Sequence, residues 1–332
     1  MATAVDHTKE VKGWWNKVCI IQKRLEGKLA IVTGANSGIG AVTTAELAQR
    51  GCKVIMACRS MERAEAAKKK IVTKYGSSNP ECVKIDVADE SVIPSLSAVT
   101  EDQLIISQLD LASLQSVREF AHHISTTYEK LDFLINNGGA CYSEHGTTVD
   151  GFEMTIGTNY LGPFLLTELL LPLLKKAAPS RVINVSSMVH FWASLEKPDL
   201  QISKGKYSLQ SAYNQSKLCN AMHAYEFNRR FQGTGVTAVS LHPGVVQTRF
   251  FDPFTSVMNK IRYVACKLVM IDEWHGAQTT LYTVLTDNLI PGAYYDNCAP
   301  KRPSRLVHDD AELKWLWDKS CELVGLDERS PK

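Results

Sequence analysis

Short apolar runs alternate along this chain with longer segments whose apolar residues recur at helical spacing. The run 29–33 ends in glycine-rich residues, and the segment 41–50 that follows is typical of a helix, with Gly51 suited to its C-terminal cap. The pattern predicts further strands at 53–57, 104–109, 131–135, 181–185 and 236–241, and helices at 61–75, 114–124, 152–177 and 211–231. This alternation indicates an α/β fold with a single domain: a doubly wound, Rossmann-type parallel sheet of about seven strands with helices on both faces.

The segment 77–100 interrupts this alternation, because two stretches can serve as the third strand. One candidate is 82–87 and the other is 104–109. We favour 104–109, since a helix with a clear apolar face follows it directly. The earlier stretch is then an inserted excursion on the surface.

Residues 1–26 are expected to form an N-terminal amphipathic extension ahead of a main domain at 27–330. Residues 9–25 carry five basic side chains, and their apolar residues, Trp14 and Trp15 among them, fall near helical spacing. A short basic helix of this kind can lie on a membrane surface. The favoured alternative is a helix whose tryptophan face packs against the domain or a partner while its basic side chains stay solvated.

Composition narrows the classes of function. Of the 332 residues 45% are hydrophobic and 22% charged, as in a globular protein with a large core. A formal net charge of +2 without a long basic block argues against nucleic-acid binding. Nine scattered cysteines without a CxxC pair argue against a disulfide framework or a metal site. Together with the lack of a signal peptide and of an apolar run of roughly 18–20 residues, they predict an intracellular protein in a reducing compartment, cytoplasmic or peripheral on a membrane.

The first strand-to-helix junction is rich in glycine. Its sequence, TGANSGIG at 33–40, has the spacing GxxxGxG and not the GxGxxG of the common dinucleotide fingerprint. Glycine lets the backbone turn tightly and approach a pyrophosphate, whose charge is stabilised by the free N–H groups of the helix N-terminus. Because the turn follows the first strand of a βαβ unit, we predict that it binds phosphate.

Tyr213 and Lys217 lie four residues apart and therefore on one face of a helix, and Ser187 ends a strand upstream. An ammonium beside a phenol stabilises the phenolate and lowers its pKa from the usual value of about 10. Such a tyrosine can exchange a proton with an alcohol or carbonyl oxygen, and Ser187 can hydrogen-bond the same oxygen. The ordered occurrence of turn, serine and Tyr-x-x-x-Lys argues against coincidence.

Together these motifs resemble the short-chain dehydrogenase/reductase family over about residues 27–325. The stretches that carry the resemblance are TGANSGIG (33–40), NNGG (136–139), GTNYLG around Asn159, INVSS ending at Ser187, YNQSK (213–217) and HPGVVQT (242–248). Other stretches are similar to the retinol dehydrogenase branch: ACRS (57–60), LDLASLQSVREFA (109–121), GPFLLTELLL (162–171), QGTGVTAVSLHPGVV (232–246), GAYYDN (292–297) and LWDKSCELVG (316–325).

The resemblance implies a catalytic tetrad of Asn159, Ser187, Tyr213 and Lys217. Tyr213 would be the acid–base and Ser187 would orient the reacting oxygen. Lys217 would tune Tyr213 and bind the nicotinamide ribose, and Asn159 would hold a water in a proton relay. The cofactor would lie in the half 27–185 and the substrate in the half 186–330. The implied cofactor residues are Gly34, Ser37, Gly38, Ile39, Gly40, Asp110, Asn137, Tyr213, Lys217 and Val246.

The chain departs from the family pattern in three respects. Gly138 replaces the usual alanine of NNAG, which is expected to loosen the turn beneath the cofactor. The insertion at 77–100 is unusual for the branch. We expect no N-terminal membrane anchor of the kind that many relatives carry, so the resemblance does not carry over an expectation of membrane residence.

The end of the second strand bears on the choice of nicotinamide cofactor. It reads Ala57-Cys58-Arg59, without the acidic residue that would bind a ribose 2′-hydroxyl and repel a 2′-phosphate. The guanidinium of Arg59 has a fork geometry suited to phosphate. NADP(H) is therefore the preferred cofactor, and NAD(H) with a merely solvated Arg59 is the alternative.

Apolar and aromatic residues follow both Ser187 and the HPGVV stretch: His190, Phe191, Trp192, Phe250, Phe251, Phe254, Val257 and Met258. Apolar walls around a polar catalytic pair suit a lipophilic alcohol or carbonyl, retinoid-like or steroid-like. The alternative is that they pack a mobile loop or a subunit contact in a homo-oligomer. The competing functions are a broad-specificity carbonyl reductase and an NADP(H)-binding scaffold or sensor without turnover. We expect His190 and His242 to be hydrogen-bonded structural histidines, and Cys141 and Cys219 receive no nucleophilic role.

Overall fold

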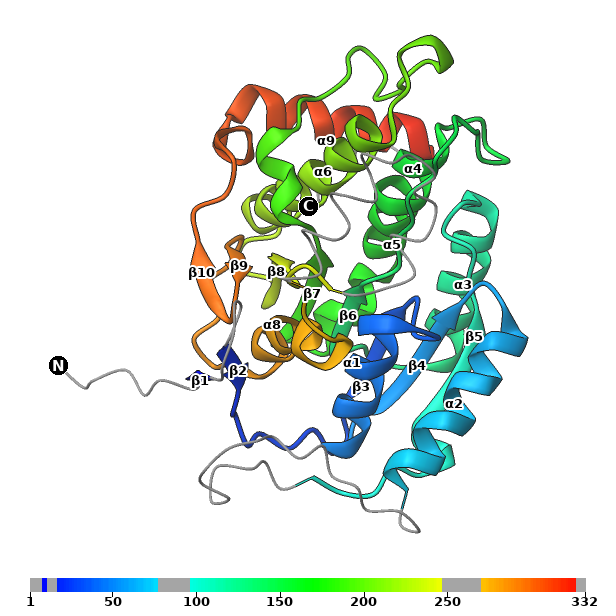
Figure 1. Cartoon of the computed structure of the whole chain (residues 1–332), viewed down its shortest axis with the longest axis vertical. Helices are drawn as coiled ribbons and strands as arrows, with labels where there is room; N and C mark the ends of the chain where they lie inside the picture. The colour runs from blue at the N-terminus through cyan, green and yellow to red at the C-terminus, as the bar shows by residue number, and fades with distance from the viewer. Residues whose placement is uncertain (1–7, 11–16, 77–95, 247–269, 327–332) are drawn as a thin grey trace, which may run out of the picture.

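In this computed structural model, the described part of the chain comprises residues 8–10, 17–76, 96–246 and 270–326. Its centre is an eight-stranded sheet with helices on both faces (Figure 1). The strand order is β10-β9-β8-β7-β6-β3-β4-β5, and all neighbours are parallel except β10, which pairs antiparallel with β9. The strands are β3 (Leu29–Thr33), β4 (Lys53–Cys58), β5 (Leu104–Gln108), β6 (Phe133–Asn136), β7 (Ser180–Val185), β8 (Val236–His242), β9 (Tyr294–Asp296) and β10 (Ala299–Lys301). The predicted fold class is confirmed, and β10 is an antiparallel edge added to seven parallel strands.

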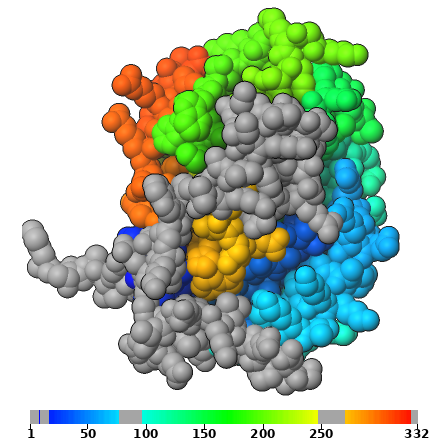
Figure 2. Space-filling view, in the orientation of Figure 1, coloured from blue at the N-terminus to red at the C-terminus, as the bar shows by residue number. Residues whose placement is uncertain are grey.

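The strands are apolar throughout because both faces of the sheet are covered. In β3, Leu29 and Ile31 join the core on one face, and Ala30 and Val32 join the core on the other. One face is covered by α1 (Gly38–Gln49), α2 (Met61–Tyr75) and α8 (Glu273–Leu285), the other by α3 (Leu114–Thr127), α5 (Gly162–Lys176) and α6 (Leu209–Arg230). Figure 2 shows the gold side chains of α8 beside the blue ones of α1 on the surface of the layer formed by α1, α2 and α8.

The later of the two candidate third strands is the correct one. β5 pairs in parallel with β4, with Ile105 opposite Ile55, and α3 follows it as the apolar pattern predicted. The earlier candidate at 82–87 lies outside the described residues, as does most of the 77–100 excursion.

The predicted helix at 152–177 is interrupted near its start. A single turn, α4 (Met154–Ile156), leads into a π-helical turn, η3 (Gly157–Leu161), before α5 begins. A π turn carries one extra residue and redirects the side chains that follow, and such turns are frequent at functional sites. Asn159 lies in its middle.

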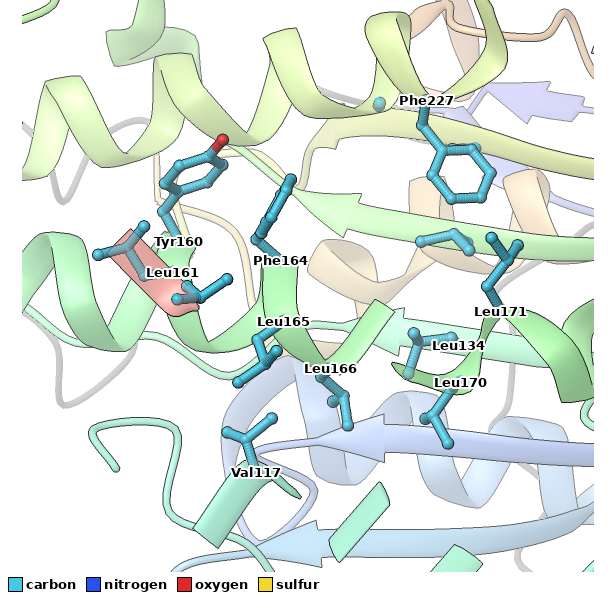
Figure 3. Packing of buried hydrophobic residues seen from close by; sticks show 14 of the residues in the cluster. Val117, Leu134, Tyr160, Leu161, Phe164, Leu165, Leu166, Leu170, Leu171 and Phe227 are labelled. Atoms are coloured by element: carbon cyan, nitrogen blue, oxygen red, sulfur yellow. The ribbon is translucent and has the colours of Figure 1, made fainter. Parts of the chain in front are cut away.

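The larger of the two apolar cores lies between the sheet and the layer formed by α3, α5 and α6. Figure 3 shows Leu165 of α5 facing Val117 of α3, while Phe164 points toward α6. The C-terminal helix α9 (Asp310–Val324) closes this core from outside, because its Trp317 stacks edge-on to Phe164 with 5.2 Å between ring centroids.

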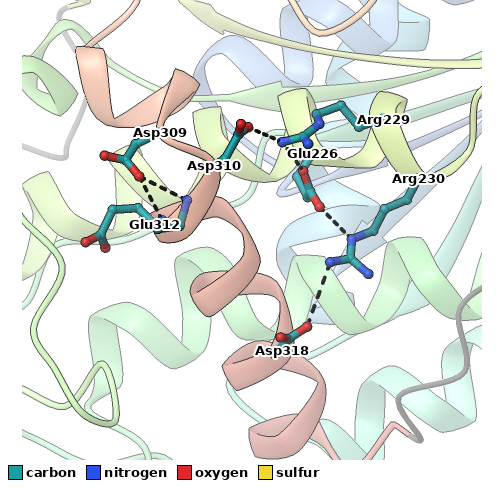
Figure 4. Close-up of polar contacts among 8 residues, drawn as sticks. Glu226, Arg229, Arg230, Asp309, Asp310, Glu312 and Asp318 are labelled. Carbon is teal, nitrogen blue, oxygen red and sulfur yellow. Dashed lines mark hydrogen bonds and ion pairs between the residues drawn. The ribbon is translucent and has the colours of Figure 1, made fainter.

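Ion pairs accompany this docking of α9 on α6 (Figure 4). Arg229 contacts Asp310 at 2.7 Å, and Arg230 contacts Glu226 at 2.8 Å and Asp318 at 3.8 Å. The Arg229–Asp310 pair is largely exposed and contributes at most about 1 kcal/mol. Apolar burial around Trp317 is therefore the main source of the docking energy.

The expectation of an N-terminal amphipathic helix is wrong for its described part. Residues 8–10 (β1, Thr8–Glu10) and 17–19 (β2, Lys17–Cys19) form a two-stranded antiparallel ribbon, and 20–26 continue without a helix. The backbone N–H groups of Lys17 and Cys19 donate to the side chains of Asn297 (2.9 Å) and Gln278 (3.1 Å). These tertiary partners satisfy the backbone N–H groups of an extended segment. The bonds therefore outweigh the weak helical periodicity of the sequence. Val18, Cys19 and Leu25 are buried, so this part packs on the domain; Trp14 and Trp15 lie outside the described residues.

Candidate active site

The motif residues converge at the carboxyl ends of the central parallel strands. The glycine-rich turn follows β3, the NNGG stretch follows β6, and Ser187 follows β7. Between β3 and β6 the strand order reverses direction, and ligands of doubly wound sheets bind in the crevice at that point. Helix α6 packs beside β7 and brings Tyr213 and Lys217 to the same edge.

Tyr213, Ser187 and Lys217 form a compact group. The side chains of Ser187 and Tyr213 are hydrogen-bonded to each other. The Lys217 ammonium donates to the carbonyl oxygen of Val185 at 2.9 Å and lies 5.4 Å from the centre of the Tyr213 ring. Lys217 is only 4% exposed, so its charge is held inside the protein.

Burial controls the protonation of this group. It raises the pKa of Tyr213 above the ordinary value of 10, with the nearby Cys141 adding to the rise and the Ser187 hydrogen bond opposing it. The expectation that Lys217 lowers the pKa of Tyr213 is therefore outweighed by burial here, and the phenol is neutral at pH 7. Burial also lowers the pKa of Lys217 to about 8, which leaves the ammonium charged at neutral pH. Cys141, whose pKa burial raises to about 12, is a neutral thiol.

Asn159 connects the loop after β6 to helix α6. Its Oδ1 accepts from the N–H of Ala140 at 2.8 Å, and its Nδ2 donates to the carbonyl of Ala140 at 2.9 Å and to the Ser216 hydroxyl at 3.2 Å. Ser216 in turn donates to the carbonyl oxygen of Tyr213 at 2.8 Å. The π turn thus aims Asn159 at the main chain of Ala140 and at the side chain of Ser216 on α6.

The glycine-rich turn has a shape that only glycine permits. Gly34 adopts a φ of +67°, and a Cβ at Gly40 would lie 2.4 Å from the carbonyl oxygen of Gly34 and 2.6 Å from Nδ2 of Asn137. Asn137 holds the turn by donating to the carbonyl of Thr33 at 2.9 Å. Gly138 N–H donates to the Thr33 hydroxyl at 2.8 Å, which ties the NNGG stretch to the end of β3.

The N-terminus of α1 differs from those of α2, α3 and α6. Serines cap α2, α3 and α6 by accepting from the first turn, whereas Ser37 makes no such bond within the described residues, and the first turn of α1 carries no acidic residue. Its N–H groups are therefore available to an anion. Turn shape and free N–H groups fit the pyrophosphate of a nicotinamide dinucleotide.

The remaining predicted cofactor residues are spread around this turn. Arg59 follows β4 directly and is exposed. Asp110, after β5, accepts from the N–H of Ala112 at 3.0 Å and so shapes its own turn. Ile39 and Val246 both lie against Gly276 of α8, which brings the start of α1 and the end of the HPGVV stretch together.

Comparisons with known proteins decide the family. The family model described as short chain dehydrogenase matches residues 28–104 and 91–258. Retinol dehydrogenase 13 of Homo sapiens is 40% identical over 316 residues, which cover 93% of this chain and 88% of the relative. The chain belongs to the short-chain dehydrogenase family.

Solved structures agree with this assignment. The crystal structure of an uncharacterised protein from Mycobacterium paratuberculosis has a TM-score of 0.70 and 32% identity, and the match covers 94% of this chain and 97% of that one. RhlG of Pseudomonas aeruginosa, solved as an NADP active-site complex, has a TM-score of 0.60 at 20% identity and covers 82% of this chain and 95% of its own, a likeness of fold alone. This short-chain dehydrogenase is accordingly an oxidoreductase that acts on CH–OH groups with a nicotinamide cofactor, and it resembles the retinol dehydrogenases.

Sequence reasoning missed two serines that hold the site of this dehydrogenase together. Ser186 donates to the carbonyl of Lys217 at 2.6 Å, and Ser216 links Asn159 to Tyr213 as described above. Both are buried, at 1% and 0% exposure. Each adjoins a predicted site residue in INVSS or YNQSK, and a polar residue at a buried position of a helix or directly after a buried strand was the available signal.

The expected apolar walls are described only in part. Phe191 and Trp192 lie in η4 (Met188–Trp192) and are 46% and 66% exposed. Phe250, Phe251, Phe254, Val257 and Met258 lie outside the described residues.

Within the described ranges, no helix is long and apolar enough to cross a membrane, and no group of three or more His, Cys, Asp or Glu side chains could hold a metal ion.

Proposed function

We propose that this chain is an NADP(H)-dependent oxidoreductase that transfers a hydride between nicotinamide and a lipophilic alcohol or carbonyl, retinoid-like or steroid-like in character. The observation that carries the proposal is the hydrogen-bonded pair of Ser187 and Tyr213 beside the buried ammonium of Lys217. It lies at the same sheet edge as the glycine-rich turn before α1.

The contacts of the four tetrad residues support the role proposed for each. When bound, the nicotinamide supplies or accepts the hydride. In reduction, Tyr213 donates its proton to the carbonyl oxygen, because burial keeps the phenol neutral. Ser187, bonded to Tyr213, orients that oxygen, and the Lys217 charge stabilises the tyrosinate that forms. Asn159 holds the loop at Ala140 and is proposed to hold a water of the proton relay.

Removal of the Tyr213 hydroxyl tests the proposed chemistry. Tyr213→Phe is expected to lower kcat by roughly 10²–10⁴-fold or more, the contribution of general acid–base catalysis, with cofactor affinity nearly unchanged. Tyr225→Phe, a change on the same helix, is the matched control and should retain full turnover. Retention of more than about a tenth of wild-type kcat in Tyr213→Phe would overturn the assignment.

NADP(H) is preferred because an arginine and no acidic residue follows β4 at Arg59. RhlG, a structural relative, was solved with NADP. Arg59→Ala is expected to weaken NADPH by roughly 10- to 150-fold and NADH far less, since a charge-assisted contact to the 2′-phosphate contributes about 1.5–3 kcal/mol. Arg63→Ala, another exposed arginine one helical turn later, should leave both affinities unchanged. Equal losses for NADPH and NADH in Arg59→Ala would count against the assignment.

Two observations support a lipophilic substrate. The first is that the aromatic side chains of Phe191 and Trp192 stay exposed, although they follow the proposed catalytic Ser187 by only four and five residues. Large aromatic side chains that stay in contact with solvent beside a polar site can form an apolar wall for a ligand. The second is that retinol dehydrogenase 13 of Homo sapiens is similar to this chain over most of its length.

A panel of carbonyl substrates with NADPH separates the competing functions. Turnover confined to retinoid-like or steroid-like carbonyls supports the proposal, and comparable kcat/KM for small, unrelated aldehydes and ketones would favour a broad-specificity carbonyl reductase. Cofactor binding without turnover of any member of the panel would favour a scaffold or sensor.

We further propose an intracellular, reducing compartment. The seven described cysteines are free thiols: Cys19, Cys52, Cys58, Cys141, Cys219, Cys298 and Cys321. Contact of residues 1–26 with a membrane surface and formation of a homo-oligomer stay predictions.

A further inference from the structure

His190 is a buried histidine close to the proposed catalytic serine. It lies in η4, three residues after Ser187, and is 0% exposed. Its ring packs against the rings of Tyr294 and Phe191, with centroids 4.6 and 4.2 Å away.

Both ring nitrogens of His190 contact the main chain. Nδ1 lies 2.7 Å from the carbonyl oxygen of Ser187, and Nε2 lies 3.1 Å from the backbone nitrogen of Ser304. A carbonyl oxygen only accepts and a backbone N–H only donates, so Nδ1 carries the proton and Nε2 accepts. The contacts therefore define a neutral imidazole in one tautomer, in agreement with the lowering of the His190 pKa by burial.

The Ser187 carbonyl receives two donors from this one residue. The backbone N–H of His190 also donates to it, at 3.2 Å. These two bonds hold the peptide that follows Ser187. The backbone of Ser187 itself has ordinary extended angles, with a φ of −160° and a ψ of 158°. The direction of the Ser187 hydroxyl toward Tyr213 depends on the orientation of this main chain.

We propose that His190 is a positioning residue for the reaction: anchored on Ser304, it holds the Ser187 main chain so that the Ser187 hydroxyl meets Tyr213. This inference rests on the proposed function. It makes the segment just before η7 (Arg305–His308) a support of the site, although Ser304 and His190 are 114 residues apart in sequence.

Three substitutions distinguish the contact at Nδ1 with Ser187 from the contact at Nε2 with Ser304. In His190→Asn the amide nitrogen stands at the same number of bonds from Cβ as Nδ1, so the bond to Ser187 can be kept while the bond to Ser304 is lost. His190→Phe keeps an aromatic ring and loses both bonds. Ser304→Pro keeps a φ of −53°, which proline adopts, but it replaces the N–H that donates to Nε2 by the ring Cδ, so it removes this donor and pushes the imidazole away.

Kinetics with NADPH and a carbonyl substrate give the first readout. His190→Phe is expected to lose about 10- to 100-fold in kcat with little change in KM or cofactor Kd, since small misplacement of a reacting group has costs of that order. His190→Asn should recover most of this loss. Ser304→Pro, which displaces the imidazole and so strains its bond to Ser187, should lose more kcat than His190→Asn. His308→Asn, at an exposed histidine of η7, is the control without effect.

A readout that does not need turnover is the ¹³Cζ resonance of Tyr213, assigned by its loss in Tyr213→Phe. It should shift in His190→Phe and stay near its wild-type position in His190→Asn. An unchanged resonance and full kcat in His190→Phe would overturn the inference, and so would equal losses of kcat, cofactor affinity and thermal stability in both His190 variants. An inactive wild type would refute the proposed function instead, while the resonance would still decide the role of His190.

Discussion

Replacement of Lys217 by methionine should stabilise the protein at neutral pH while removing its activity. A pKa of about 8 in place of the ordinary 10.5 means that burial opposes the charged form of Lys217. At about 1.4 kcal/mol per pH unit, the difference corresponds to a destabilisation of about 3 kcal/mol while the ammonium is charged. Methionine removes the charge but also the bond to the Val185 carbonyl, worth about 1 kcal/mol. The net expectation at pH 7 is a gain of about 2 kcal/mol in the free energy of unfolding.

The sign of the pH dependence follows from the two protonation equilibria. Below pH 8 Lys217 is charged in both the folded and the unfolded chain, so the full cost is present. Between pH 8 and 10.5 the folded protein releases the proton and the unfolded chain keeps it, so the wild type gains stability as pH rises. The advantage of Lys217→Met should therefore shrink across this interval.

Urea denaturation of wild type and Lys217→Met at pH 7, 8, 9 and 10 measures the difference directly. Lys204→Met, a change at an exposed lysine, is the matched control and should show a small difference that does not depend on pH. The reasoning is refuted if Lys217→Met is less stable than wild type at pH 7, or if the difference between them stays constant from pH 7 to 10. Loss of turnover in the same variant would show that stability has been exchanged for function.

Two further substitutions test the cofactor turn and the support of the sheet. Gly40→Ala should weaken cofactor binding and lower the free energy of unfolding by about 1–3 kcal/mol, because its Cβ would lie 2.4 Å from the Gly34 carbonyl oxygen. Gly205→Ala, which has open space around it, should do neither. A cofactor titration and a thermal melt measure the two effects. Arg181→Met should cost about 2–3 kcal/mol in urea denaturation, because the guanidinium donates to the carbonyls of Thr283, Val284 and Thr286 at 2.6–2.8 Å, and a loss below about 0.5 kcal/mol would contradict this interpretation.

Much of the fold could be predicted from the sequence because parallel strands buried on both faces leave continuous apolar runs. The runs at 29–33 and 53–57 became β3 and β4, and the choice of 104–109 as the third strand was correct because an amphipathic helix followed it. The proximity of Ser187, Tyr213 and Lys217 could also be predicted, since their motifs place particular residue types at short fixed spacings next to strand and helix ends.

The tertiary structure decided what depends on contacts between distant segments. Residues 17–19 form a strand and not a helix because Asn297 and Gln278 supply hydrogen-bond partners from the other end of the chain. The pKa of Tyr213 is set by burial more than by Lys217, and burial is a property of the packed molecule. The contact of His190 with Ser304 has the same origin: local sequence specifies which side chain is present, but only packing determines which main-chain group it meets.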